Sequence, residues 1–198
     1  MDFIKEISAF IPRCEQEERD KKNILDFISH FSSNVLLRDN EIAHITSSGF
    51  IMNPELTKVL LAHHNIMKTW AWTGGHADGD PDLLHVALKE AKEETGVLGI
   101  QPLQPAIASL DILPVFGHWK NGRYVSTHLH LSIAYLFVCD EDQAFHIKPD
   151  ENTGIAWFDT DYFTKEHFNE SDVYLYHKLI DRARENSAMC SLSNHSFR

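Results

Sequence analysis

The stretch GGHADGDPDLLHVALKEAKEETGV, residues 74–97, joins a glycine-rich loop to a helix with an acidic end. Asp80 can cap a helix with its side-chain oxygen, and Pro81 suits the first helical position because the N–H that proline lacks would have no partner there. Gly96 can close the other end in a left-handed conformation. We therefore predict a helix over residues 81–95, preceded by a loop whose glycines let the backbone approach a ligand closely.

The predicted helix has an apolar face and an acidic face. Apolar residues at the spacing of a buried stripe are Leu84, Ala87, Leu88 and Ala91. On another face lie Glu90, Glu93 and Glu94, whose mutual repulsion opposes helix formation by about 0.2–0.5 kcal/mol per pair. Lys89 and Lys92 could screen this charge on an ordinary solvated surface. A bound divalent cation would neutralise it more completely, and carboxylate oxygens select hard ions such as Mg²⁺ or Mn²⁺.

The loop and helix together resemble the Nudix box, G-x5-E-x7-R-E-U-x-E-E-x-G-U, in which U is aliphatic. The positions that match the box in register are Gly75, Glu90, Glu93, Glu94, Gly96 and Val97. The motif GGHADGD, residues 74–80, is also similar to the corresponding segment of a bacterial subgroup of this family. Two positions depart from the box, with Pro81 in place of the first Glu and Lys89 in place of the Arg. Lysine offers one ammonium group where arginine offers a planar fork, so Lys89 would orient the acidic cluster less rigidly.

The resemblance extends from about residue 43 to residue 158. It implies a Nudix-like α/β/α sandwich, an α+β fold with a mixed β-sheet. The residue patterns predict compatible elements. Strand patterns fall at residues 45–52, 59–61, 107–112, 128–138 and 155–158, with a hairpin tip at residues 120–122 and an amphipathic helix at residues 172–186.

The length and composition suit one globular domain with additions at its ends, since the chain has 198 residues of which 43% are hydrophobic. Apolar residues fall at helical spacings in the first forty positions. We expect a helical extension over residues 1–40 that packs on the domain, a Nudix hydrolase domain over residues 41–188, and a loose polar tail over residues 189–198.

The family resemblance also implies an activity, the hydrolysis of a diphosphate linkage in a nucleoside diphosphate-X or a similar phosphorylated small molecule, with Mg²⁺ or Mn²⁺ as cofactor. The implied metal ligands are the backbone of Gly75 and the carboxylates of Glu90, Glu93 and Glu94. The implied catalytic residues are Glu93, Glu94 and Glu151. Glu94 would act mainly as a ligand, which leaves either Glu93 or Glu151 as the general base.

Substrate recognition is indicated more weakly. The candidates for contact with the substrate are Gly74, His76 and Trp72. His128 and His130 share one face of their predicted strand and, with His76, could contact phosphate or a metal ion. We expect instead that this pair is exposed or satisfied within the core. Core positions are also expected for the other aromatic candidates, Trp70, Trp119 and Tyr124.

The net charge of the chain indicates which classes of binding partner are excluded. A net charge of -11 argues against binding to a nucleic-acid polymer or an anionic membrane, because both need concentrated Lys and Arg. No stretch approaches the roughly 18 apolar residues that a membrane span needs. We expect a cytoplasmic protein whose partner is a phosphorylated small molecule. The sequence also leaves open whether the protein forms a homodimer through its N-terminal helical segment.

Two alternatives to hydrolysis stay open. Pro81 weakens the box, which allows a non-catalytic module that binds a nucleotide or a nucleotide sugar as a signal. Isomerisation of a prenyl diphosphate would need a catalytic thiol, and the surroundings of Cys14, Cys139 and Cys190 in the sequence do not indicate one.

Overall fold

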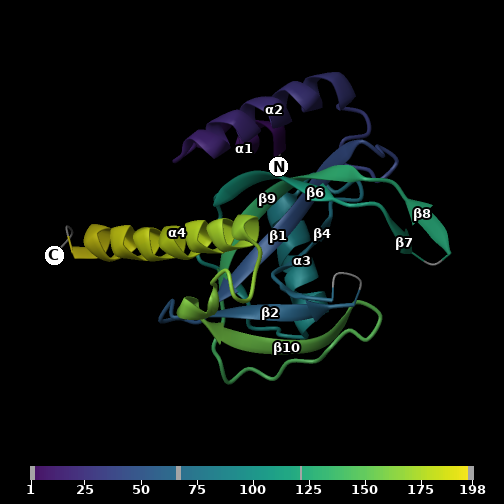
Figure 1. The fold of residues 1–198 in the computed structure, drawn as a ribbon. Coiled ribbons are helices and arrows are strands. Elements are labelled where there is room, and N and C mark those ends of the chain that lie inside the picture. Colours follow the sequence, from purple (N-terminus) through teal and green to yellow (C-terminus); the bar gives the residue numbers. More distant parts are fainter. Residues whose placement is uncertain (1–2, 66–67, 121, 196–198) are drawn as a thin grey trace.

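The computed structural model describes residues 3–65, 68–120 and 122–195 of the chain (Figure 1). Its helices are α1 (Phe3–Ala9), α2 (Glu15–Phe31), α3 (Leu83–Thr95), α4 (Glu170–His195) and the short 3-10 helix η1 (Thr160–Tyr162). Its strands are β1 (Ala43–Met52), β2 (Lys58–His64), β3 (Trp70–Ala71), β4 (Thr73–His76), β5 (Gln101–Pro102), β6 (Ser109–Val115), β7 (His118–Lys120), β8 (Arg123–Val125), β9 (His128–Val138) and β10 (Asn152–Asp159). In this part of the chain, no helix is long and apolar enough to cross a membrane.

A mixed sheet of eight strands forms the centre of the fold. Its main path runs β10-β2-β1-β9-β5, while β3 pairs with β2, β4 with β1 and β6 with β9. β1 and β9 are parallel along their whole length, and the other neighbours are antiparallel. β7 and β8 form a separate two-stranded ribbon.

Helices cover both faces of this sheet, as Figure 1 shows for α3 and α4. Side chains alternate along a strand, so the two faces of β1 face two different apolar cores. Ile45 and Ile51 belong to the core on the α3 side, whereas Phe50 and Met52 belong to the core beside α4. A mixed sheet between helices confirms the predicted fold class.

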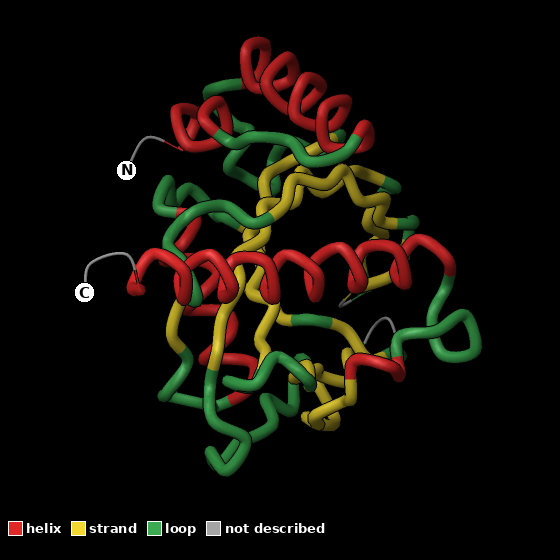
Figure 2. Tube along the Cα trace, turned by 90° about the vertical axis from the view of Figure 1, so that its left-hand side faces the viewer, coloured by secondary structure: helices red, strands yellow, loops and turns green. Residues whose placement is uncertain are grey.

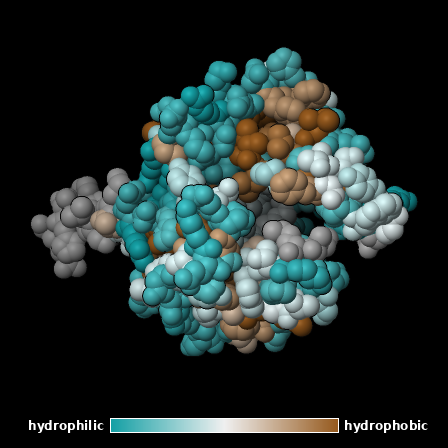
Figure 3. All heavy atoms as spheres, viewed as in Figure 1, coloured by the Kyte–Doolittle hydropathy of each residue, from teal (hydrophilic) through white to brown (hydrophobic). Residues whose placement is uncertain are grey.

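The N-terminal helices contribute to the same core as α3. Ile7 of α1 and Ile24 and Ile28 of α2 are buried in one cluster with Ile45 and Ala87. Figure 2 shows these helices packed together at one end of the molecule, across the strands. The face seen in Figure 3 is mainly hydrophilic, and apolar atoms gather near the N-terminal helices. The burial of these helices supports a helical extension that packs on the domain.

Helix α3 begins two residues later than the sequence predicts. Asp82 is the N-cap, since its side chain accepts a hydrogen bond of 3.0 Å from the His85 N–H. Asp80 instead accepts a bond of 2.9 Å from the Asp82 N–H and supports the turn before the helix. Pro81 therefore lies in this turn, outside the helix, and the prediction that it opens the helix is wrong.

The buried face of α3 also differs from the predicted stripe. Its buried residues are Leu83, Val86, Ala87, Ala91, Glu94 and Thr95. Leu84 and Leu88 are only half-buried and pack at the edge of the core. The stripe is rotated because the helix packs on β1 and β4 through its smallest residues, Ala87 and Ala91, which allow close approach.

Three further boundaries differ from the predictions. β6 extends to Val115 because it pairs with β9 as far as His128. Helix α4 continues to His195, into the segment expected to be a loose tail, and residues 196–198 lie outside the described residues. Of the predicted hairpin tip, residue 121 also lies outside them, while Lys120 and Arg123 on either side are paired.

Candidate active site

The glycines before α3 bring backbone directly against its acidic residues. In β4, Gly74 pairs with Ser48 and Gly75 with Ser47 of β1. A Cβ atom at Gly75 would lie 2.5 Å from Cδ of Glu90, which is closer than non-bonded carbon atoms approach. Only glycine lets the backbone and the Glu90 carboxylate come this close.

Glu94 is buried under the same loop, with 6% of its surface exposed. Its Oε1 accepts a hydrogen bond of 2.9 Å from the Gly74 N–H. Burial raises the pKa of Glu94 to about 8 despite this bond, and the charges of Glu151 and Glu90 act in the same direction. The sequence predicted that Glu94 lies on an acidic face separate from the buried stripe. Glu94 is instead buried together with Ala87 and Ala91, where its carboxylate bonds the glycine loop.

Glu90 and Glu93 are both more exposed than Glu94, and Glu93 is the more exposed of the two. Burial raises the pKa of Glu90, whose side chain is 17% exposed, while that of Glu93 is 42% exposed. Nζ of Lys89 lies 3.5 Å from Glu90 and 3.8 Å from Glu93. Lys89 therefore screens two of the acids as a single charge, without the paired hydrogen bonds that an arginine could make.

Glu151 reaches this cluster because its loop is fixed to the end of α3. The buried Asn152 donates a hydrogen bond of 2.9 Å to the Glu94 carbonyl, and the His146 N–H donates one of 2.8 Å to the Thr95 carbonyl. Nζ of Lys148 then lies 3.0 Å from Glu151 and 3.4 Å from Glu93. The structure thus brings all four acidic site candidates of the sequence together.

The sequence did not indicate two of the residues that organise this acidic cluster. Lys148 and Asn152 flank Glu151, but nothing in their local pattern shows that this loop returns to α3. The Lys148-x-x-Glu151 spacing was the available signal. Arg38 was also missed. Its guanidinium forms two hydrogen bonds of 2.7 Å with Asp78, which fix the glycine-rich loop to the segment before β1.

The donor set at this site fits a divalent cation. Carboxylate oxygens and backbone carbonyls are the hard ligands that Mg²⁺ and Mn²⁺ prefer. Burial is the main cause of the raised pKa of Glu94, and the negative charges of Glu151 and Glu90 raise it further. Lys148, placed between Glu93 and Glu151, offsets part of this negative charge. A cation held by the carboxylates would relieve the same repulsion more directly.

The substrate candidates of the sequence lie on two different sides of β4. Gly74 contacts Glu94 through its N–H. Trp72 packs with Phe50 and Tyr176 in the core beside α4. Because Gly75 faces α3, its neighbour His76 points to the opposite face of the sheet.

On that opposite face His76 meets three other histidines. His44, on β1, was missed, although the alternating polar residues His44, Thr46 and Ser48 in an apolar strand were a signal. His128 and His130 complete the group. His128 is buried and its Nδ1 bonds the Ser126 carbonyl at 2.8 Å, as expected of a histidine satisfied in the core. His130 differs, because its buried Nε2 has no hydrogen-bond partner among the described residues.

The remaining aromatic candidates divide between core and surface. Trp70 packs against the core beside α4, as expected. Trp119 and Tyr124 are 72% and 59% exposed, so the expectation of core positions is wrong for them. They lie on the β7–β8 ribbon, which pairs only with itself, and their rings contact each other at 5.6 Å between centroids.

Comparison with known protein families gives a match to the NUDIX domain over residues 43–179. The chain belongs to the NUDIX family. The matched range includes the Gly74–Gly75 loop, α3 and the loop that carries Glu151. No curated protein matches the chain.

Three solved structures are similar to this NUDIX chain at low sequence identity. A C. elegans Ap4A hydrolase in a binary complex is 14% identical with a TM-score of 0.47, over 68% of this chain and 93% of that one. A Clostridium perfringens hydrolase of the NUDIX family is 21% identical with a TM-score of 0.47, over 70% and 96%. A Bacillus halodurans MutT protein is 16% identical with a TM-score of 0.41, over 69% and 81%.

Proposed function

We propose that this NUDIX protein hydrolyses a diphosphate linkage in a nucleoside diphosphate-X or a similar phosphorylated small molecule, using Mg²⁺ or Mn²⁺. The observation that carries the proposal is the convergence of Glu90, Glu94 and the Gly74–Gly75 backbone, with Gly75 in contact with Glu90 and Gly74 bonded to Glu94. A solvated acidic helix face has no need of a glycine loop packed against it.

Glu90, Glu93, Glu94 and the carbonyl of Gly75 would hold the cation. Such a cation, when bound, neutralises charge on diphosphate oxygens and lowers the pKa of a water molecule. The buried Glu94 and the fixed Gly74–Gly75 backbone keep the ligand set in place, and the covered side of α3 excludes water from it. Lys89 and Lys148 balance the charge of the more exposed carboxylates.

We infer that Glu151 is the general base. Both candidates from the sequence, Glu93 and Glu151, contact Lys148, but Glu93 belongs to the ligand set while Glu151 lies beside it on a separate loop. The Glu151 side chain is 41% exposed, so it can exchange its proton with solvent after each turnover. Lys148 holds its carboxylate toward the cluster.

The test is a screen for phosphate release in the presence of Mg²⁺ or Mn²⁺ over nucleoside triphosphates, nucleotide sugars, dinucleoside polyphosphates and coenzymes. Glu94→Gln should reduce turnover of any substrate found by at least about 100-fold, because the buried ligand is lost without a change in side-chain size. Glu18→Gln, on the exposed surface of α2, is the matched control and should retain full turnover.

The same screen separates the hydrolase from a binding module. Turnover that is unimpaired in Glu94→Gln would refute the proposed ligand set. If no compound of the panel is hydrolysed but one of them binds measurably, the result would favour a protein that senses a nucleotide or nucleotide sugar.

A further inference from the structure

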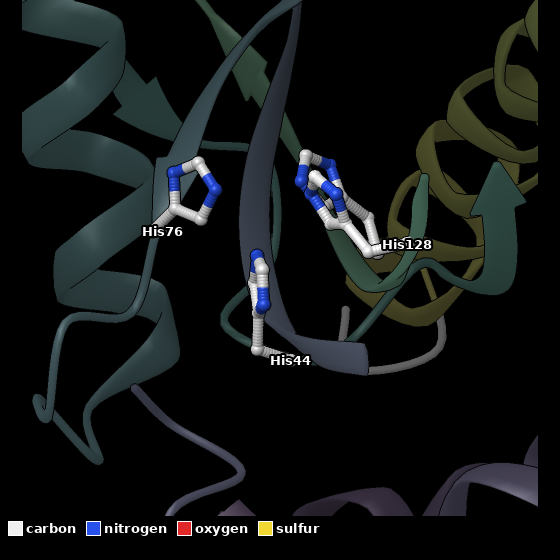
Figure 4. A group of neighbouring side chains, drawn as sticks. His44, His76 and His128 are labelled. Carbon is white, nitrogen blue, oxygen red and sulfur yellow. The ribbon is translucent and has the colours of Figure 1, made fainter. Parts of the chain in front are cut away.

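Four histidines from three strands meet on the face of the sheet opposite to Glu90. His44 of β1 pairs directly with His130 of β9 in the parallel ladder, and His76 of β4 pairs with Thr46, two residues from His44. Residues two apart in a strand share a face, so His44, His76, His128 and His130 all lie on the same one. Figure 4 shows the rings of His44, His76 and His128 turned toward one another.

The four rings are close enough to share one ligand. One ring nitrogen from each lies within 4.8 Å of all the others. Zn²⁺ bound by four imidazoles at about 2.0–2.1 Å has nitrogens about 3.4 Å apart at the corners of its tetrahedron. The nitrogens therefore need to approach by at most about 1.4 Å, which side-chain rotation can supply.

Two of the rings are fixed by hydrogen bonds from Nδ1 to a backbone carbonyl, which is how many metal-bound histidines are oriented. Nδ1 of His44 donates to the Asn40 carbonyl at 2.9 Å, and Nδ1 of His128 donates to the Ser126 carbonyl at 2.8 Å. A carbonyl can only accept, so the proton of each ring is on Nδ1 and the lone pair is on Nε2. This is the arrangement in which an outer carbonyl fixes the tautomer of a metal ligand.

Two ring nitrogens of the cluster have no hydrogen-bond partner among the described residues. They are Nε2 of His44 and Nε2 of His130, which are both buried. Buried polar atoms are nearly always satisfied in folded proteins, so two such atoms in one cluster of neighbouring rings need an explanation.

We propose that His44, His76, His128 and His130 bind one Zn²⁺ ion in a site separate from the NUDIX carboxylates. The group contains imidazoles and no carboxylate, which selects Zn²⁺ or a similar transition-metal ion over Mg²⁺. Four protein ligands close the coordination sphere, as in structural zinc sites. The ion would tie β4 and β9 to β1, and the proposal does not depend on the hydrolase activity.

The first test uses untagged full-length protein freed of metal with a chelator. Co²⁺ is titrated as a spectroscopic probe, and Zn²⁺ is then added in competition. We expect the first equivalent of Co²⁺ to give the intense visible absorption of tetrahedral cobalt and to be displaced by one equivalent of Zn²⁺. The weak spectrum of octahedral cobalt, or no binding, would overturn the proposal.

Variants assign the bound ion to this cluster. His128→Gln and His130→Gln should each weaken Zn²⁺ binding by at least about 100-fold, since even an outer partner of a ligand is worth 10–100-fold. The matched control is His118→Gln, a half-buried histidine outside the cluster whose Nδ1 also bonds a backbone carbonyl. Glu94→Gln should bind Zn²⁺ as the wild type does. Equal affinity in all four variants would place the ion elsewhere.

A measurement on the wild-type protein covers the case in which the histidine variants do not fold. X-ray absorption at the zinc edge should show four nitrogen ligands at about 2.0 Å with the scattering pattern of imidazole rings. A first shell of oxygen ligands would assign the zinc to the carboxylates and refute the histidine site.

Discussion

The Gly74 N–H donates a hydrogen bond of 2.9 Å to Oε1 of the buried Glu94. This bond joins the first glycine of the loop to the last acid of the helix, across nineteen intervening residues. It also leaves Glu94 with a pKa of about 8, because one N–H does not compensate for the water that burial removes. The cation site that we propose therefore includes a carboxyl group that is protonated at neutral pH in the metal-free protein.

Mg²⁺ binding should release a proton from Glu94. Below the pKa of about 8, the apparent Mg²⁺ affinity should rise by up to about tenfold per pH unit and then level off. Calorimetric titrations at pH 6, 7 and 8, in buffers of different ionisation enthalpy, measure both affinity and proton release. In Glu94→Gln the pH dependence should be much smaller. A wild-type affinity that is constant over this range would contradict the protonated state of Glu94.

The same carboxyl group should make the metal-free protein less stable at high pH. The folded-state pKa of Glu94 lies above its ordinary value of 4.5, so the folded state holds the proton more tightly than the unfolded state. The unfolding free energy should fall as the pH rises from about 4.5 to about 8, and Glu94→Gln should lack this fall. Urea unfolding in the presence of a chelator, at pH 5 and pH 8, compares the two proteins. An equal pH dependence in both would rule out this contribution.

Gly75→Ala should damage the site without unfolding the protein. The added Cβ would lie 2.5 Å from Cδ of Glu90, so the carboxylate must move away from the backbone. A displacement of about 1 Å can cost about 100-fold in turnover, and we expect a loss of that order. Steady-state kinetics measure it, with Gly122→Ala as the control for a glycine remote from the site. The φ of 76° at Gly122 strains an alanine, but nothing lies within 4 Å of a Cβ there. Equal turnover in the two variants would show that the close approach has no catalytic role.

Lys148→Met should strengthen cation binding. Nζ of Lys148 lies 3.4 Å from Glu93 and 3.0 Å from Glu151, and its positive charge opposes a divalent cation. Removing one charge at the edge of the site is worth about 1 kcal/mol, or roughly a fivefold gain in Mg²⁺ affinity at low salt. Calorimetry gives the affinity, and Lys165→Met, an exposed lysine paired with Glu170, is the control. Weaker binding in Lys148→Met would mean that the lysine positions the carboxylates more than it repels the cation.

Arg182→Met should destabilise the junction between the N-terminal helices and α4. Glu17 of α2 has no exposed surface, and both guanidinium nitrogens of Arg182 on α4 bond its carboxylate. Losing one partner of a buried ion pair costs about 3–5 kcal/mol. We expect the lower end of this range, because Nζ of Lys178 stays 3.5 Å from the buried Glu17 carboxylate. Urea unfolding should show this loss, and a smaller one in the double variant Glu17→Met with Arg182→Met.

A surface ion pair provides the comparison for this variant. Arg19 and Glu15 pair on the exposed side of α2, with both side chains about three-quarters exposed. Arg19→Met should change the unfolding free energy by no more than about 1 kcal/mol. Equal losses in Arg19→Met and Arg182→Met would mean that the buried pair does not hold the extension to the domain.

The sequence by itself determined the parts of this protein that depend on local spacing. Glu90, Glu93 and Glu94 lie at i, i+3 and i+4, so any helix through residues 83–95 brings their side chains together. The strand pattern of residues 128–138 predicted β9 with the bounds that it has in the structure. Even here the detail of capping was missed, because Asp80 and Asp82 are equivalent as caps in the sequence and the turn before the helix selects Asp82.

Only the tertiary structure decided which side chains from distant segments meet. The burial and raised pKa of Glu94 depend on the loop that covers it, and Glu151 arrives through the bond from Asn152 to the end of α3. The histidine cluster depends on the register of β1 with β9 and β4, in which a shift of one residue would turn His44 to the other face. Strand register is fixed by the packing of both cores at once, and no local pattern contains that information.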